Sequence, residues 1–275
     1  MGLRIGTNVA SLTVQRNIEN NSTEMARSMA RLSSGQRVTS AGDDAAGLSL
    51  SSNLEAELRG LRQASRNAND GVSFAQVAEG GLNEVNNILI RLRELGVQAG
   101  SDTIGDEERG FLNKEFQSLK EEINRIAQVS NYNGRQLLNG SGGELEFQVG
   151  AHKSQNDKIV FLASEANVTA GHLGVSGTSV ESKGSALDSL EDIDAAIQKV
   201  NGFRSSLGAL QNRLHSAVNN LGTHIENLAE AKSRIADTDI AEEASKLARQ
   251  NVLQSAGIAV LAQANAAPNG ITRLL

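Results

Sequence analysis

The sequence predicts a mainly α protein: a long helical bundle or coiled-coil rod that carries a small β-hairpin and paired terminal helices. Three observations lead to this prediction. Aliphatic residues recur at spacings of three, four and seven over long stretches of the 275-residue chain, which is the pattern of an apolar helical stripe. A single Pro leaves nearly the whole chain free to be helical. Aromatic residues are only 3% of the chain, so any core must be mainly aliphatic.

The first long helix is expected over residues 43–97, where no Pro interrupts the apolar stripe. The Gly80-Gly81 pair weakens this helix by about 1 kcal/mol per Gly but need not break it. A second helix is expected over residues 106–129, because three acidic residues begin it and complement the positive end of the helix dipole. Its predicted apolar side consists of Phe111, Phe116, Leu119, Ile123 and Ile126.

The apolar period changes to two after residue 143. Leu145, Phe147 and Val149 alternate with polar residues, and Ile159 and Phe161 repeat the alternation after a polar turn. Such alternation is typical of strands with one buried face, so segments 144–149 and 157–162 are predicted to form a hairpin. Residues 163–185 are rich in Gly, Ser and Thr and are expected to be a loop. A third long helix is predicted over residues 187–235.

Both ends of the chain carry thin seams with the spacing of coiled coils. Polar residues in such a seam set its register at a cost in stability, and a lone helix of this kind cannot bury enough apolar surface to stay folded. We therefore expect the ends to order against each other or against neighbouring chains. The N-terminal seam is Ile5, Val9, Leu12, Ile18, Met25, Met29 and Leu32; the C-terminal seam is Ile240, Leu247, Gln254 and Leu261, with Ala244, Asn251, Ile258 and Asn265 beside it.

The residue inventory is poor in catalytic groups. There is no Cys, the four His residues form no zinc motif, and neither a phosphate-binding loop nor a nucleophile elbow is present. Adjacent carboxylates such as Glu121 and Glu122 point about 100° apart on a helix, so they do not converge on a substrate. We therefore expect no enzyme, and no catalytic, cofactor or metal site.

Charge and hydropathy disfavour two further classes of partner. The net charge is −6 and no run of basic residues occurs, which argues against nucleic-acid binding. Residues 250–272 carry no charge, but several Gln and Asn residues interrupt them. A membrane-spanning helix needs about 20 predominantly apolar residues, so we expect no membrane insertion.

Several motifs follow one another along the chain, including LSSG at 32–35, SAGDDAAGL at 40–48, NYNG at 131–134, FQVGA at 147–151 and VLAQAN at 260–265. With these motifs in this order, the chain strongly resembles bacterial flagellin. The similarity covers about residues 1–165 and 200–275. The large variable outer insertion that many flagellins carry is missing, so the chain resembles a minimal flagellin.

The resemblance implies a structural subunit that polymerises into the bacterial flagellar filament for motility. The alternative is the hook–filament junction, or hook-associated, protein of the same family. The resemblance also implies a terminal coiled-coil domain, residues 1–43 with 236–275, that lines the inner tube of the filament, and a helical core domain over residues 44–235. The residues expected to pack in the filament are Ile5, Val9, Leu12, Leu32, Ile240, Leu247, Ile258 and Leu261.

The resemblance further implies a set of partners and a location. The partners are other flagellin subunits, an export chaperone at the C-terminal helix, and the hook-associated and cap proteins. Export through the flagellar type III apparatus would place the protein in the extracellular flagellum, and residues 1–30 contain no classical signal peptide. A Toll-like receptor is a further expected partner, through Arg91, Leu95 and Glu122. Subunit packing is the alternative role for these three residues.

Overall fold

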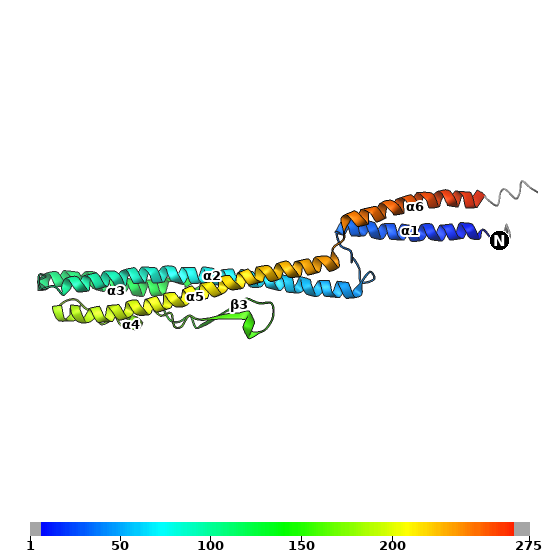
Figure 1. The fold of residues 1–275 in the computed structure, drawn as a ribbon. Helices are drawn as coiled ribbons and strands as arrows, with labels where there is room; N and C mark the ends of the chain where they lie inside the picture. Colours follow the sequence, from blue (N-terminus) through cyan, green and yellow to red (C-terminus); the bar gives the residue numbers. More distant parts are fainter. Residues whose placement is uncertain (1–6, 267–275) are drawn as a thin grey trace, which may run out of the picture. The chain divides into compact units, whose positions relative to one another are not determined.

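The computed structural model describes residues 7–266 and confirms the mainly α prediction (Figure 1). The chain forms two compact units: one ends at Ala56 and resumes at Asn227, and the other spans Glu57–Glu226. We call the first the terminal unit and the second the core unit. The elements are α1 (Val9–Ser34), α2 (Ala45–Ala99), α3 (Asp106–Val129), β1 (Asn131–Tyr132), β2 (Arg135–Gln136), β3 (Glu144–Gln148), β4 (Lys158–Leu162), α4 (Ala170–Leu173), α5 (Lys183–Ala236) and α6 (Ile240–Ala266).

The boundaries of the predicted helices agree closely with these elements, because no residue within the predicted segments disrupts them strongly. The predicted helices at 43–97, 106–129 and 187–235 correspond to α2, α3 and α5. The predicted domain boundary at 43/44 falls in the connection between α1 and α2, and the one at 235/236 falls just before the last residue of α5. The division into those two domains stays a prediction.

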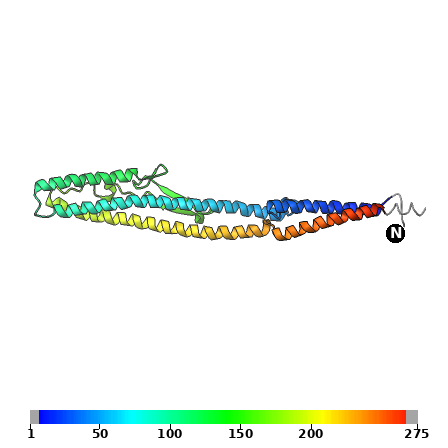
Figure 2. The same cartoon turned by 90° about the horizontal axis from the view of Figure 1, so that it is seen from above.

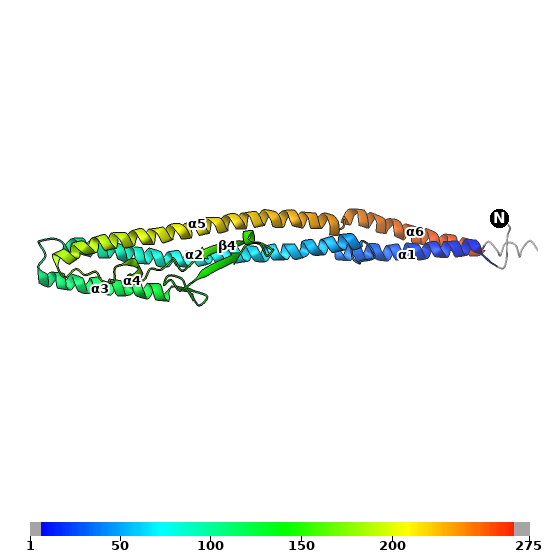
Figure 3. The same ribbon diagram turned by 90° about the horizontal axis from the view of Figure 1, so that it is seen from below.

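In the core unit, α2, α3 and α5 run beside one another (Figures 2 and 3). Leu82, Leu89 and Leu92 of α2 are fully buried in one cluster with residues of α5. A Cβ added at Gly71 would lie 2.9 Å from Cδ1 of Phe147, and one at Gly81 would lie 2.6 Å from Cδ1 of Leu138. These glycines weaken the helix locally but let side chains of the strand region approach its backbone.

The predicted hairpin at 144–149 and 157–162 is confirmed. Strands β3 and β4 pair antiparallel, with Phe147 opposite Ile159 and Leu145 opposite Phe161. Phe147, Phe161 and Tyr132 surround Phe74 of α2, with ring centroids 5.7–6.1 Å from that of Phe74. The few aromatic residues are therefore concentrated where the strands pack on α2, and this contact secures the hairpin to the core.

The buried side of α3 agrees with the prediction except at Phe111. Phe116 and Ile123 are fully buried, and Leu119 and Ile126 pack against the core. Phe111 was expected on the same side but is 61% exposed, with Nζ of Lys114 5.6 Å from its ring centroid. The buried positions also include Arg109, Asn113 and Lys120, which follow the helical period from Phe116. Phe111 lies five residues from Phe116, about 140° around the helix, so its hydrophobicity was misleading.

The segment 163–185 is more ordered than the predicted loop. It contains α4, and its residues Val168, Val175 and Val180 are fully buried in the core. Polar side chains of α3 bind its backbone: Nζ of Lys120 donates to the carbonyl groups of Ser176 and Thr178 at 2.8 and 2.7 Å. Oδ1 of Asn113 accepts from N of Val180 at 3.2 Å. These bonds satisfy buried backbone groups that lack regular secondary structure.

Candidate functional site

Helices α1 and α6 of the terminal unit lie side by side and run antiparallel (Figure 1). Each helix has a polar cap at its start: Oδ1 of Asn8 accepts from N of Ser11, and Oδ1 of Asp239 accepts from N of Ala241. Helix α1 ends at Ser34, and the φ of 71° at the next residue, Gly35, is in the left-handed region that favours glycine. The helix pair is therefore defined by local sequence signals at these ends.

Hydrogen bonds between side chains and backbone join the two helices along their seam. Near one end, Nδ2 of Asn8 donates to the carbonyl of Ala264 at 2.8 Å, and Oγ of Ser11 donates to Oδ1 of Asn265 at 2.8 Å. In the middle, Nδ2 of Asn21 donates to the carbonyl of Gln250 at 2.9 Å. The seam is therefore substantially polar, in contrast with the aliphatic seam of an ordinary stable coiled coil.

The structure divides the predicted packing residues between the seam and the opposite faces. Leu32, Leu247 and Leu261 are half-buried at the heptad positions that face the partner helix. Val9, Leu12, Ile240 and Ile258 are exposed. Ile5 lies outside the described residues.

Most of the second heptad series predicted for α6 lies outside the seam with α1. Ala244, Asn251 and Ile258 are exposed, and the positions turned toward α1 are one residue earlier: Glu243, Gln250, Gly257 and Ala264. Asn265 is also exposed, but its Oδ1 accepts a hydrogen bond from Oγ of Ser11 of α1. Heptad spacing alone does not choose between these two adjacent series.

The outer faces of this pair are rich in apolar side chains. Val252 of α6 is 68% exposed, and Leu253 and Val260 are about half exposed. Together with Val9, Leu12, Met29, Ile240 and Ile258, they leave much apolar surface of the terminal unit exposed, whereas the seam combines polar and small residues with half-buried Ile18, Leu247 and Leu261. Exposed apolar surface of this kind marks protein–protein contact sites.

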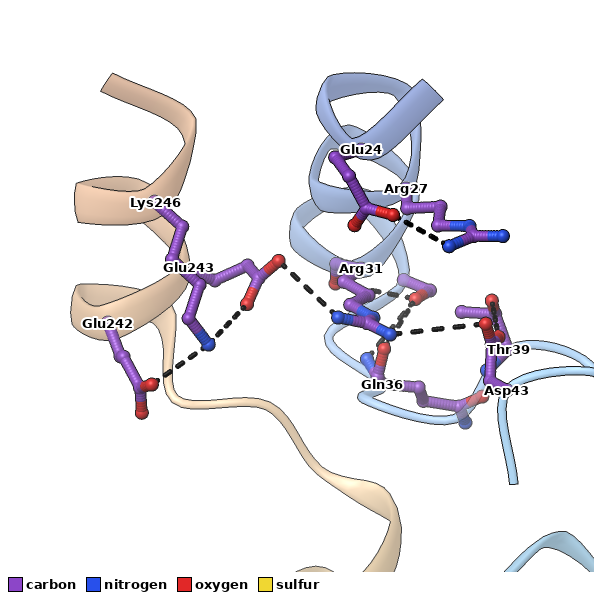
Figure 4. Close-up of polar contacts among 10 residues, drawn as sticks. Glu24, Arg27, Arg31, Gln36, Thr39, Asp43, Glu242, Glu243 and Lys246 are labelled. Atoms are coloured by element: carbon purple, nitrogen blue, oxygen red, sulfur yellow. Dashed lines mark hydrogen bonds and ion pairs between the residues drawn. The ribbon is translucent and has the colours of Figure 1, made fainter. Parts of the chain in front are cut away.

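An arginine links α1, the loop after it, and the first turn of α6 (Figure 4). Its guanidinium lies between two carboxylates: NH2 of Arg31 is 3.9 Å from Oδ1 of Asp43, and NH1 is 3.8 Å from Oε1 of Glu243. Glu243 is only 3% exposed, and its Oε1 accepts no hydrogen bond within the described chain. A buried carboxylate strongly requires a nearby cation, so Arg31 is its main charge partner across the seam.

Asp43 organises the loop that follows α1. Its Oδ2 accepts hydrogen bonds from N and Oγ1 of Thr39 and from N and Oγ of Ser40, at 3.0–3.3 Å. Hydrogen bonds from the side chains of Ser40 and Thr39 lower the pKa of the Asp43 carboxyl. A backbone hydrogen bond attaches this loop to the end of α5: N of Arg37 donates to the carbonyl oxygen of Ala236 at 2.7 Å.

The residues expected at a receptor surface lie in the core unit. Arg91 is exposed and pairs with Glu94 and Glu115 at 3.0 and 2.9 Å. Glu122 is partly exposed and pairs with Arg125 at 2.6 Å. Leu95 is 0% exposed within the core cluster. The expectation for Leu95 is therefore corrected, because a fully buried side chain is not available to a receptor while the core unit is folded.

Two histidines line a shallow pocket of about 320 Å³ in the core unit, His152 and His224, together with Glu57 and Asp157. Nε2 of His152 is 4.0 Å from Oε1 of Glu57. Within residues 7–266, no group of three or more His, Asp or Glu side chains is arranged to hold a metal ion. None of the helices in that described range is long and apolar enough to cross a membrane.

Comparison with known proteins agrees with this architecture. The family pattern described as "Bacterial flagellin N-terminal helical region" matches residues 5–142, and the "Bacterial flagellin C-terminal helical region" matches residues 190–275. A flagellin of Halalkalibacterium halodurans is 40% identical over 271 residues, which cover 98% of this chain and 99% of the relative.

Two further relatives extend the comparison. The flagellar filament core protein of Brachyspira hyodysenteriae is 37% identical over 286 residues, with 98% of this chain and 99% of the relative covered. The crystal structure of Bacillus cereus flagellin is 30% identical and superimposes with a TM-score of 0.52, over 61% of this chain and 94% of that one. The matches along the whole chain are to filament flagellins, so the hook-associated alternative is not favoured. The chain belongs to the bacterial flagellin family, the structural subunits of the extracellular flagellar filament.

Proposed function

We propose that this subunit polymerises through the apolar residues that its terminal helices present away from each other. The observation that carries this proposal is the exposed apolar surface of α1 and α6, where Val9, Leu12, Ile240 and Ile258 lie outside a partly polar seam. Burial of these side chains against other copies would remove apolar surface from water. Repeated contacts between different faces of identical subunits build an open helical filament.

The other predicted packing residues have a second role in this proposal. Leu32, Leu247 and Leu261 are half-buried where α1 and α6 meet, so they hold the pair together inside each subunit. Ile5 lies outside the described residues, and its packing in the filament stays a prediction. Packing between subunits and packing within a subunit are thus assigned to different faces of the same two helices.

The test is seeded elongation by purified chain, followed by electron microscopy and sedimentation. Ile258→Asp places a charge on the outer face of α6, and we expect it to prevent elongation while leaving the helix content of the soluble chain unchanged. The matched control is Phe111→Asp, which places a charge at an exposed apolar position of the core unit. Elongation by Ile258→Asp at the rate of the unmodified chain would contradict the proposal.

The exposed apolar side chains of α6 are suited to an export chaperone before assembly. Val252, Leu253 and Val260 are exposed within about 100° of one another, on a helix that carries no charged side chain from Gln250 to its end. A chaperone would cover these side chains during type III export to the extracellular flagellum. Hook-associated and cap proteins would contact the same terminal helices at the two ends of the filament. This structural role requires no catalytic centre, and we propose none.

Recognition by a Toll-like receptor is a separate proposal for the core unit. Its support is the accessible charged surface around Arg91 and Glu122. Reporter cells treated with soluble chain should respond, and Arg91→Ala should reduce the response. Silence of the cells toward both proteins would contradict receptor recognition without affecting the proposal for assembly.

A further inference from the structure

We infer that three unlike contacts in the α1–α6 seam specify a single register of the terminal helix pair. We call them the register contacts: Arg31 with Glu243, Asn21 with Gln250 and Gln254, and Ile18 with Gly257. One contact is ionic, one is amide-mediated and one is steric. Their spacing along both helices makes each of them incompatible with a shifted pairing.

The amide contact lies in the middle of the seam. Nδ2 of Asn21 donates to the backbone carbonyl of Gln250 at 2.9 Å and to Oε1 of Gln254 at 3.1 Å. The side chain of Gln250 adds to the polarity of this region, since its Oε1 is buried and accepts no hydrogen bond within the described chain. Buried polar groups of this kind disfavour any pairing that removes their remaining partners.

The ionic contact lies toward the loop end of the seam. Glu243 is buried, and the guanidinium of Arg31 approaches it from α1 at 3.8 Å. Lys246 reaches the other oxygen of Glu243 from the same helix, at 3.5 Å. Because Lys246 moves together with Glu243, only Arg31 makes the ionic interaction dependent on the register of α1 against α6.

The steric contact lies between the amide contact and the chain ends. A Cβ added at Gly257 would lie 2.9 Å from Cγ1 of Ile18 and 3.5 Å from its Cδ1. The side chain of Ile18 thus occupies space that only glycine leaves open. At a contact this tight, a larger residue opposite Ile18 would push the helices apart.

A shift of one heptad breaks all three contacts together. If α6 moves so that its residues meet positions seven earlier on α1, Glu243 comes beside Glu24 in place of Arg31, and Gln250 comes beside Val14 in place of Asn21. Ile18 then faces Gln250. In the opposite shift, Ile18 meets Ala264 and Glu243 lies beyond the end of α1. Either shift strands a buried charge and leaves amides without partners.

The register determines which outer residues lie next to each other. Val9 and Leu12 lie at the end of α1 that meets the end of α6, where Ile258 and Val260 are exposed. A shifted pair would displace these apolar residues by seven positions, about 10 Å along the helix. This consequence rests on the proposed function, since the outer faces matter only if they contact other subunits.

Disulfide trapping tests the register directly, because the chain contains no Cys. The native reporter is Ser11→Cys with Asn265→Cys, at positions whose side chains contact each other. The shifted reporter is Ser11→Cys with Ile258→Cys, one heptad away. Each full-length chain is oxidised both in solution and in seeded filaments, and non-reducing electrophoresis separates intrachain from interchain products. We expect at least tenfold more intrachain product from the native reporter.

Arg31→Gln in the native reporter leaves Glu243 without its partner on α1. We expect a several-fold loss of native intrachain product, and partial recovery in Arg31→Gln/Glu243→Gln, which removes the stranded charge. A role of Arg31 in general helix stability would show no such recovery. The matched control is Arg27→Gln, since Arg27 lies one turn earlier on α1 and pairs with Glu24 on the exposed side (Figure 4).

The outcomes for the register and for assembly are separate. Equal native product from Arg31→Gln and Arg27→Gln, no recovery in the double variant, or no native product from the otherwise unmodified reporter in either state would overturn the inferred register contacts. If Arg31→Gln loses the native disulfide yet elongates filaments at the normal rate, the register contacts stand and the link to the proposed outer packing surface fails.

Discussion

The core unit and the terminal unit are both built from long helices with heptad-like spacing, yet they differ in how much apolar surface they bury. Leu82, Leu89 and Leu92 of α2 are completely buried in one aliphatic cluster. In the terminal pair, Asn21 and Glu243 share the seam with half-buried leucines, and other large apolar residues remain exposed. The spacing of apolar residues therefore shows that a helix has a buried and an exposed face. The polarity of the buried residues indicates whether a helix gains its stability within one chain or from contacts with other chains.

Removal of residues 250–275 is the strongest test of this comparison. Filament formation should be lost completely, because most of α6 and its outer apolar face disappear, while the core unit keeps its helices. Electron microscopy with seeds and circular dichroism measure the two results. Filaments that survive the deletion would show that the core unit alone supplies the contacts for assembly.

Leu89→Ala should have the largest effect on the stability of the soluble chain. Leu89 is 0% exposed, and a large-to-small change in a packed core costs about 2–5 kcal/mol. Thermal unfolding of the core unit measures it. Leu253→Ala, at an exposed position of α6, is the control and should leave the unfolding midpoint of the core unit unchanged. If both variants lowered the unfolding midpoint of the core unit equally, burial in the core unit would not distinguish Leu89 from Leu253.

Asn113→Ala removes a polar side chain of the core unit whose hydrogen-bond partners are present, unlike those of Oε1 of Glu243 in the terminal pair. The backbone N of Val180 would lose its acceptor and the carboxylate of Glu181 would lose a donor. An unsatisfied buried group costs about 1–3 kcal/mol. Chemical denaturation measures the loss, and hydrogen exchange should show faster opening of residues 174–181. Ser118→Ala, at an exposed position of the same helix, serves as the control.

The smallest effect is expected from acidification of the loop after α1. Since hydrogen bonds from Ser40 and Thr39 lower the pKa of Asp43 below 3.8, the folded loop binds this proton less readily than the unfolded chain. Its stabilisation is therefore fully present above the unfolded pKa and is lost as the pH falls through the lower, folded value. A nuclear magnetic resonance titration of the Asp43 carboxyl measures this, and Asp43→Asn should remove the dependence. A carboxyl that titrates above 3.8 would contradict the assignment.

Much of the fold could be predicted because its signals are local. Spacing of aliphatic residues located α2, α3 and α5, and a change to period two located β3 and β4. The wrong predictions concern side chains whose burial in the folded chain differs from what their polarity suggests. Phe111 is apolar yet exposed, whereas Lys120 is charged yet buried, because backbone carbonyl groups of residues 176 and 178 accept its hydrogen bonds.

The candidate site was only partly predictable. Heptad spacing correctly placed Leu247 and Leu261 on the face of α6 that meets α1. It missed Glu243, Gln250 and Gly257, because heptad spacing gives the period of a seam but does not say which of two adjacent series faces the partner helix. The series with Ala244, Asn251 and Ile258 has the same spacing one residue later, and only the folded pair distinguishes the two.

The sequence by itself determined the helices, the hairpin and the family, because backbone propensity, side-chain period and motif order are properties of neighbouring residues. Only the tertiary structure decided which face of each terminal helix meets the other. That choice depends on pairs more than 200 residues apart, such as Arg31 with Glu243 and Ile18 with Gly257. Its energy comes from charge pairing and steric fit between the two helices, and neither is present in the chain until both ends have folded together.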